Sequence, residues 1–224
     1  FPDTPILRMD ADTIGAGHEA ILKEFDEKKV PILIGTQMVA KGLDFENVTL
    51  VGVLAADLSL HANDYRCGER TFQLLTQAAG RAGRDSLAGN VVIQTYDPEN
   101  YSICAAAAQD YKGFYEQEIL FRKLAGYPPS GGMLVIHGSG ESEEHLTLAM
   151  DYLKKFIDVL VKKSQVQVLG PVDEQIAKVN DIYRKVIYLK YREKKILIMI
   201  KNKVEQYIEM NEGYHTVNIQ YDVE

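Results

Sequence analysis

The chain has 224 residues, of which 46% are hydrophobic and 25% charged, a composition typical of a globular protein with one large domain or two modest ones. No apolar run approaches the roughly 20 residues that a membrane span requires, which excludes a membrane-spanning protein. The two cysteines, Cys67 and Cys104, are too few for a structural zinc site or a disulfide scaffold, so we expect a reducing compartment, the cytoplasm.

Residues 1–125 alternate apolar strands with amphipathic helices. Such alternation requires crossover connections and predicts a mostly parallel sheet that helices cover on both faces. The continuous apolar run at residues 30–36 is typical of a buried parallel strand. The predicted strands are Ile6–Met9, 30–36, 48–54 and 91–95, and the predicted helices are 18–29, 66–80 and 101–124.

A domain boundary is predicted at residues 126–132, where two prolines are followed by two glycines. Beyond it the pattern is strand, helix, strand, strand, helix, strand, the arrangement of a small ferredoxin-like α+β domain. Gly170-Pro171 is expected to end the second of these strands, which begins at Val166. The predicted domains are therefore 1–127, an α/β domain with its trailing helix 101–125, and 128–224, an accessory α+β domain.

The net charge of −7 conceals a basic stretch at residues 178–203. Nine cations there face only Asp181 and Glu193, which predicts a cationic surface able to bind nucleic acid. An ordinary solvated surface is the alternative. The cations are Lys178, Arg184, Lys185, Lys190, Arg192, Lys194, Lys195, Lys201 and Lys203.

The segment Gln77-Ala78-Ala79-Gly80-Arg81-Ala82-Gly83-Arg84 carries two arginines, three positions apart, at the end of a predicted helix. The glycines between them remove side-chain bulk, so another surface can approach closely. Guanidinium groups are permanently charged and match phosphate oxygens. The pattern favours a pair of arginine fingers for phosphoryl transfer, with a helix end bearing two solvated arginines as the alternative.

A second segment, from Gly35 to Phe45, follows the apolar strand at residues 30–36. Backbone N–H groups and the Thr36 hydroxyl at the end of a strand can bind a phosphate. Lys41 adds a cation, Gly42 permits a tight backbone, and Asp44 is an acceptor suited to a ribose hydroxyl or an arginine. Turn chemistry is the alternative for any one of these residues.

Together the two segments resemble the fifth and sixth conserved motifs of superfamily 2 helicases. Asp57 and the stretch from Asp64 to Gln77 resemble the PriA family of replication-restart helicases, also called primosomal protein N′. Residues 8–13, 169–172 and 221–224 are also similar to that family. The resemblance covers essentially the whole chain. It implies a RecA-like second helicase lobe followed by the C-terminal domain of the family.

The resemblance also implies roles for particular residues. Arg81 and Arg84 are expected to reach the γ-phosphate of a nucleotide held by the first lobe, and Gln77 to couple that site to the nucleic acid. Gly42 and Asp44 are expected beside the nucleotide. The expected DNA contacts are Gly35, Thr36 and Lys41 in the first domain and Arg184 and Lys185 in the second.

Several family features are absent from the sequence. No Gly-x-x-x-x-Gly-Lys-Ser/Thr loop is present to bind the β- and γ-phosphates, and no Asp-Glu pair ends an apolar strand to hold Mg²⁺. The cysteine-rich zinc module of the family is also missing. We therefore expect a piece of a longer protein, inactive alone, whose ATP and Mg²⁺ bind mainly to the missing first lobe. No metal site is expected here.

The resemblance implies an ATP-dependent 3′-to-5′ DNA helicase that restarts stalled replication forks and promotes primosome assembly. Its expected partners are forked or single-stranded DNA, primosome proteins and single-stranded-DNA-binding protein, with no membrane. One alternative is another superfamily 2 DNA translocase, such as a RecG-like branch-migration enzyme. The other is that the isolated chain is a non-catalytic DNA- or protein-binding module.

Overall fold

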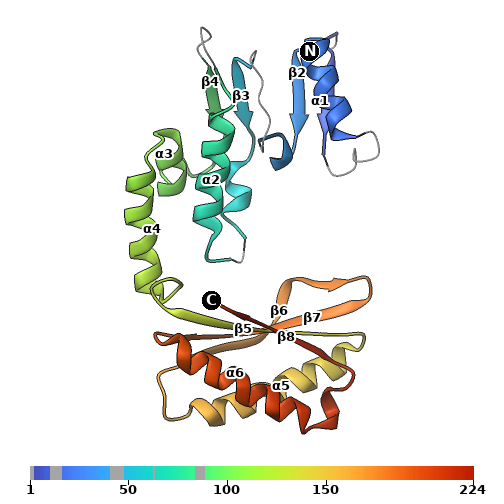
Figure 1. The fold of residues 1–224 in the computed structure, drawn as a ribbon, viewed down its shortest axis with the longest axis vertical. Helices are drawn as coiled ribbons and strands as arrows, with labels where there is room; N and C mark the ends of the chain where they lie inside the picture. The colour runs from blue at the N-terminus through green and yellow to red at the C-terminus, as the bar shows by residue number, and fades with distance from the viewer. Residues whose placement is uncertain (1–2, 11–16, 41–47, 63, 84–88) are drawn as a thin grey trace. The chain divides into compact units, whose positions relative to one another are not determined.

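The computed structural model of the chain describes residues 3–10, 17–40, 48–62, 64–83 and 89–224 (Figure 1). The chain divides into two compact units, Phe1–Glu116 and Gln117–Glu224. None of the helices in the described ranges is both long enough and apolar enough to cross a membrane.

The first unit consists of short parallel strand pairs joined through helices, which confirms the predicted α/β class. Strand β1 (Ile6–Met9) pairs in parallel with β2 (Ile32–Gly35), and β3 (Leu50–Val53) pairs in parallel with β4 (Asn90–Ile93). Within the described residues these are two separate two-stranded sheets. The helical elements are α1 (His18–Glu27), η2 (Gln37–Ala40), η3 (Ala56–Ser59), α2 (Cys67–Ala79) and α3 (Tyr101–Ala107).

Side chains from α2 and from the helices that follow β4 form the core of the first unit. Phe72 of α2 stacks on Phe114, with their ring centroids 4.3 Å apart, and both rings are buried. Leu75, one turn along α2, and Ile103 of α3 belong to the same cluster. This packing holds α2 in place, and α2 leads directly to the predicted arginine segment.

The prediction of a single helix at residues 101–124 is wrong. The structure has α3, which ends at Ala107, and α4 (Tyr111–Ala125). Gln109 between them adopts a left-handed backbone with φ of 52°. The carboxylate of Asp110 then accepts a hydrogen bond of 2.9 Å from the N–H of Gly113, satisfying one of the free amide donors at the start of the new helix.

Residues 30–36 were predicted to form a buried strand. The strand is present as β2, but the prediction that it is buried is wrong. Ile34 in β2 is 53% exposed, and Leu50 at the start of β3 is 61% exposed. Parallel strands are normally covered on both faces, but here a cavity lies beside the two strands.

The second unit has the predicted strand–helix–strand–strand–helix–strand order. Its four antiparallel strands lie in the order β6-β7-β5-β8, which is the ferredoxin-like arrangement. Helices α5 and α6 cover one face of this sheet (Figure 1). The elements are β5 (Gly132–Gly140), α5 (Glu143–Val161), β6 (Gln167–Val179), β7 (Ile182–Tyr191), α6 (Lys194–Glu209), η4 (Glu212–Tyr214) and β8 (Asn218–Val223).

The prediction that Gly170-Pro171 ends a strand is wrong, because β6 continues to Val179. The ladder with β7 shifts its register between Leu169 and Val172 and again between Asp173 and Lys178. Such irregularities allow an edge strand to contain a proline, which has no N–H to donate to the ladder.

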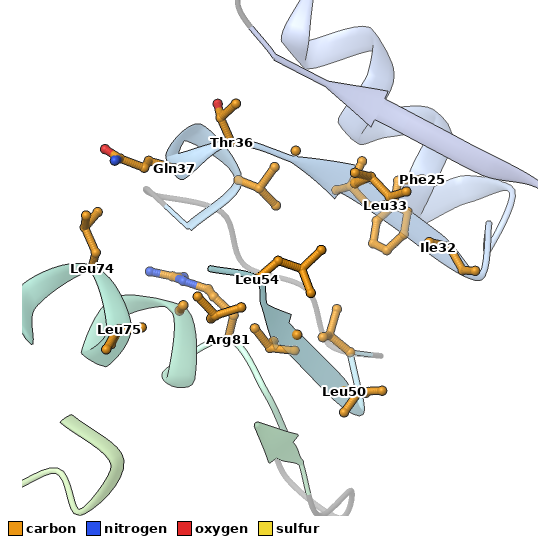
Figure 2. A pocket seen from close by; sticks show the side chains of 18 of the residues that line it. Phe25, Ile32, Leu33, Thr36, Gln37, Leu50, Leu54, Leu74, Leu75 and Arg81 are labelled. Carbon is orange, nitrogen blue, oxygen red and sulfur yellow. The ribbon is translucent and has the colours of Figure 1, made fainter. Parts of the chain in front are cut away.

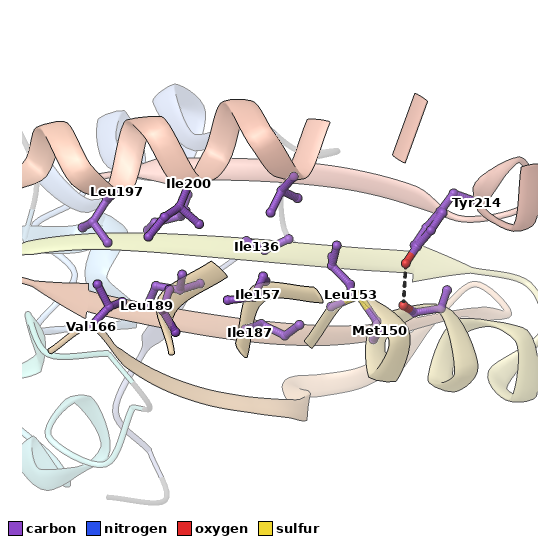
Figure 3. Packing of buried hydrophobic residues seen from close by; sticks show 14 of the residues in the cluster. Ile136, Met150, Leu153, Ile157, Val166, Ile187, Leu189, Leu197, Ile200 and Tyr214 are labelled. Carbon is purple, nitrogen blue, oxygen red and sulfur yellow. Dashed lines mark hydrogen bonds between the residues drawn. The ribbon is translucent and has the colours of Figure 1, made fainter. Parts of the chain in front are cut away.

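Leucine, isoleucine and methionine side chains fill the space between this sheet and its two helices (Figure 3). Ile136 of β5 and Leu153 of α5 are both fully buried there. At one end of the cluster the hydroxyl of Tyr214 donates a hydrogen bond of 3.1 Å to the carbonyl of Ala149. Burial also raises the pKa of the Tyr214 phenol, so this hydroxyl stays protonated as a donor.

The core of the second unit supplies a test of stability. We expect Leu153→Ala to lower the free energy of unfolding by about 2–5 kcal/mol, because it removes a fully buried side chain and leaves a cavity. The control is Val159→Ala on the same helix, where the side chain is 74% exposed and the expected change is within about 0.5 kcal/mol. Urea denaturation of both variants measures the difference, and equal losses would contradict this description of the core.

Candidate nucleotide and DNA interface

A cavity of about 1020 Å³ lies in the first unit between β2, β3 and the end of α2 (Figure 2). Most of its wall is apolar, formed by residues such as Leu33, Leu50 and Leu75. Thr36, Gln37 and Arg81 are polar lining residues. The structure therefore places Thr36 and Arg81, two residues singled out in the sequence, beside the same cavity.

The end of β2 is shaped by Gly35. A Cβ at this position would overlap the carbonyl oxygen of Met9 on the neighbouring strand, so only glycine allows the approach. The N–H of Thr36 donates to that same carbonyl, at 3.3 Å, and the carbonyl of Thr36 accepts from Val39 in the turn that follows. Thr36 is exposed at this corner, where its hydroxyl is accessible to a phosphate.

The end of α2 positions Arg81. The helix stops at Gly80, and the N–H of Arg81 donates a hydrogen bond of 3.0 Å to the carbonyl of Ala78. Two residues later the N–H of Gly83, at a φ of 73°, donates to the carbonyl of Val48 at 2.9 Å. These bonds direct the chain from the helix toward β3. As a result the Arg81 guanidinium, which carries a permanent charge, lies beside the cavity.

Gly35 also lines this cavity, whereas Gln77 is not among its lining residues. Gln77 is exposed on α2, one turn before Arg81. Lys41, Gly42, Asp44 and Arg84 lie outside the residues that the structure describes. Their expected contacts remain predictions.

Asp57 is a buried acid near this site whose partners are distant in the sequence. Its carboxylate accepts a hydrogen bond of 2.6 Å from the Thr95 hydroxyl and another of 3.0 Å from the N–H of Tyr96. The Thr95 bond, followed by the Tyr96 bond, lowers the pKa of Asp57. The charged carboxylate thus joins η3 to the end of β4, which gives it a structural role next to β3.

In the second unit the structure does not bring Arg184 and Lys185 to one surface. The two residues are adjacent on β7, and neighbouring side chains of a strand point to opposite faces of the sheet. Lys185 lies on the same face as Ile187, which packs against the helices, and its ammonium is 2.7 Å from Asp173. Arg184, paired in register with Ser139, lies on the face turned away from α5 and α6.

Ion pairs neutralise part of the basic stretch at residues 178–203. Lys178 is 2.9 Å from Asp181, and this carboxylate raises the pKa of Lys178. Lys201 is 2.6 Å from Glu205, an acid just outside the stretch. Lys190 lies over the ring of Tyr127, 3.6 Å from its centroid. The residue count already included Asp181, and the contact of Lys190 with Tyr127 leaves its charge in place. Only Asp173 and Glu205, acids outside the stretch, make the local excess of positive charge smaller than the count predicted.

The sequence provided no signal for the charged cluster around His137. Its Nδ1 lies 2.6 Å from Glu174, and its Nε2 lies 3.3 Å from Asp222. His137 belongs to β5, Glu174 to β6 and Asp222 to β8, so only the folded sheet brings them together. Glu174 and Asp222 lie, like Arg184, on the face of the sheet turned away from the helices, so this face carries negative as well as positive charge. Among the described residues, no group of three or more His, Cys, Asp and Glu could hold a metal ion.

Comparison with known proteins assigns both units. Residues 3–86 match the helicase conserved C-terminal domain, and residues 123–224 match the primosomal protein N C-terminal domain. The chain is 42% identical over 216 residues to the replication restart protein PriA of Bacillus subtilis, covering 92% of this chain and 27% of that protein. It is 33% identical over 224 residues to the PriA protein of Borreliella burgdorferi, covering 99% of this chain and 33% of that protein.

These matches define the chain first as a helicase C-terminal domain followed by a small α+β domain. The second domain and the relatives then specify the family. The chain belongs to the PriA family of replication restart proteins and matches its C-terminal part. It spans about a quarter to a third of the length of these relatives.

The hydrogen bonds of Asp57 predict how stability depends on pH. Its folded pKa lies below the usual value of about 3.9, so the stabilisation is present above that pH and is lost as the pH falls through the folded pKa. We expect Asp57→Asn to lower the melting temperature at pH 7, with the difference from the native chain shrinking below about pH 4. Thr95→Val, which removes the first bond, is the comparison variant. A difference that does not change with pH would contradict a role for the charge.

Proposed function

We propose that this chain is the second helicase lobe and the accessory domain of an ATP-dependent DNA helicase that restarts stalled replication forks. The lobe comprises residues 1–127 and the accessory domain residues 128–224. The observation that supports the proposal is that Arg81 and Thr36 line one cavity within the residues that match a helicase domain. The PriA relatives support the assignment to replication restart.

In the proposed mechanism, ATP and Mg²⁺ bind mainly to the remainder of the longer protein, because this sequence has no phosphate loop. Arg81 and Arg84 reach the γ-phosphate and stabilise the charge that develops as it is transferred. Gln77 couples the nucleotide site to the bound nucleic acid. Gly42 and Asp44 lie beside the nucleotide. Loss of the γ-phosphate removes the attraction for Arg81, so the two lobes have different affinities for each other before and after hydrolysis.

The proposed contacts of the lobe to DNA are made by the end of β2. The backbone at Gly35, the hydroxyl of Thr36 and the cation of Lys41 bind the phosphates of one strand. Each cycle of opening and closing of the two lobes shifts these phosphate contacts along the DNA strand, which gives 3′-to-5′ translocation. Primosome proteins and single-stranded-DNA-binding protein are the proposed partners, and the cytoplasm is the proposed compartment. Zinc is proposed for the longer protein only.

The arginine assignment is tested in a full-length family protein that carries this chain. We expect Arg81→Ala and Arg84→Ala each to lower DNA-stimulated kcat for ATP by about 10³-fold or more, while ATP binding is retained, because the guanidinium charge acts in the transition state. We expect Arg81→Lys to restore little of the lost kcat, because an ammonium lacks the planar, two-pronged hydrogen-bonding geometry of a guanidinium. Turnover and nucleotide affinity are measured separately.

The matched control is Arg70→Ala on the same helix, where the guanidinium pairs with Asp64 at 2.8 Å. We expect it to leave kcat close to that of the native protein. Unchanged turnover in the Arg81 variant, or an equal loss in the Arg70 variant, would contradict the assignment.

A second candidate function, DNA binding by the accessory domain, is favoured by the position of Arg184 away from the helices. We expect Arg184→Ala to weaken binding of single-stranded DNA to the 224-residue chain and to reduce the slope of log K against log salt by about 0.7, the contribution of one phosphate. Lys185→Ala is the comparison and should change the slope less, because its ammonium already pairs with Asp173. The reverse order would exclude Arg184 as the contact.

A further inference from the structure

The second unit has a cavity of about 610 Å³ in its helical layer, which we call the α5–α6 cavity. One wall is a row of side chains from the first half of α5, spaced so that they lie on one face of the helix. The end of α6 and the short helix η4 form the other wall. The cavity is lined by His145, Leu148, Ala149 and Tyr152 from α5 and by Tyr207 and Glu212 from the opposite side.

Aromatic packing fixes the shape of this cavity. Tyr207 stacks on Phe156 of α5, with ring centroids 4.1 Å apart, and meets the ring of Tyr214 edge-on at 5.9 Å. The buried Tyr214 in turn donates its hydroxyl hydrogen bond to the carbonyl of Ala149 (Figure 3). These contacts join α5, α6 and η4, so the cavity is formed in advance of any ligand.

The cavity is open to an approaching chain and partly apolar. Leu148 is 49% exposed and Tyr152 is 57% exposed. A Cβ built on Gly213, which also lines the cavity, would meet no atom within 4 Å, so the backbone of η4 is accessible as well. Exposed apolar side chains gathered around a formed cavity are typical of a surface that binds a protein partner.

The rim of the α5–α6 cavity is acidic. Glu212 lines it, and Glu144 and Asp151 neighbour Leu148 on the surface of α5, four residues before it and three after it. All three acids are exposed, and within the described residues none of them forms an ion pair. Lys155, 5.1 Å from the ring centroid of Tyr152, is a cation at this rim. The excess of negative charge disfavours phosphate groups, whether of DNA or of lipid, and favours lysine and arginine.

We propose that the α5–α6 cavity binds a short basic segment of a partner protein, in which one bulky aliphatic side chain is flanked by lysines or arginines. The aliphatic side chain packs between Leu148 and Tyr207, and the flanking cations face Glu212 on one side and the acids of α5 on the other. The volume is that of a typical ligand site, roughly 300–1000 Å³, which suits a few side chains of a peptide.

Binding at this cavity is independent of the proposed nucleotide and DNA contacts. The cavity belongs to the helical layer, whereas Arg184 lies on the face of the sheet turned away from α5 and α6. A basic peptide therefore leaves that face free, and it needs neither Arg81 nor Arg84.

Selection of short random peptides displayed on phage tests the site in a full-length family protein that carries this chain. We expect the recovered peptides to have a net positive charge and a leucine, isoleucine or methionine in common. A synthetic peptide of the consensus sequence should bind the native protein. Tyr152→Ala, which removes part of the apolar wall, and Glu212→Lys, which reverses a rim charge, should each weaken its binding on the order of 10-fold or more.

Two variants serve as matched controls. Val159→Ala removes an exposed apolar side chain from α5 outside the cavity, and Glu193→Lys reverses a charge at the opposite end of α6. We expect both to change the affinity for the peptide by no more than about twofold. The melting temperature of each variant is measured alongside, and that of Tyr152→Ala should stay close to the native value because this side chain is mostly exposed.

Three results would overturn the assignment of a basic peptide to this cavity. The first is that the selection yields acidic peptides, or none whose binding depends on Tyr152 and Glu212; the absence of such peptides is also the outcome if another part of the longer protein already covers the cavity. The second is an equal loss of affinity in the control variants. The third is self-association of the native protein, measured by analytical ultracentrifugation, that Tyr152→Ala abolishes, because the occupant is then a second copy of the chain.

Discussion

The function proposed for this chain depends on how the backbone at the end of α2 positions the side chain of Arg81. The end of α2 is held by the stacking of Phe72 on Phe114 in the core and by the bond from Gly83 to Val48. Arg81 lies in the segment between these two interactions, and its side chain faces the cavity that Thr36 also lines. A permanent charge on a fixed backbone needs no reorganisation when an anion arrives, which is the requirement for stabilising a transition state.

The accessory domain provides a stable platform with little excess charge. Its core is buried, and three cations of its basic stretch, Lys178, Lys185 and Lys201, already have acidic partners. Of the two basic residues predicted to contact DNA in this domain, Arg184 rather than the paired Lys185 is therefore the better candidate. The carboxylates around His137 lie on the same face of the sheet as Arg184.

Features that depend on local periodicity were predictable from the sequence. The parallel pairs of the first unit and the ferredoxin-like order of the second follow from apolar patterns and turn residues. The break at Gln109 did not, because the surrounding alanine-rich sequence favours a helix and contains no proline or glycine before Gly113. The position of Lys185 was missed because a surplus of basic residues does not show which face of a strand each one occupies.

The candidate site was predictable only where local sequence patterns indicate it. Thr36 and Arg81 were indicated by strand ends and glycine spacing, and the structure places both beside one cavity. The bonds of Asp57 to Thr95 and Tyr96 join residues almost forty positions apart, so they could not be inferred from local sequence. The role of Arg81 is measured by the affinity of a full-length family protein for ADP with aluminium fluoride, a mimic of the transferring phosphate, compared with its affinity for ADP alone. We expect Arg81→Ala to abolish the preference for the mimic and to leave ADP affinity unchanged; a preference equal to that of the native protein would show that Arg81 does not contact the transferring phosphate.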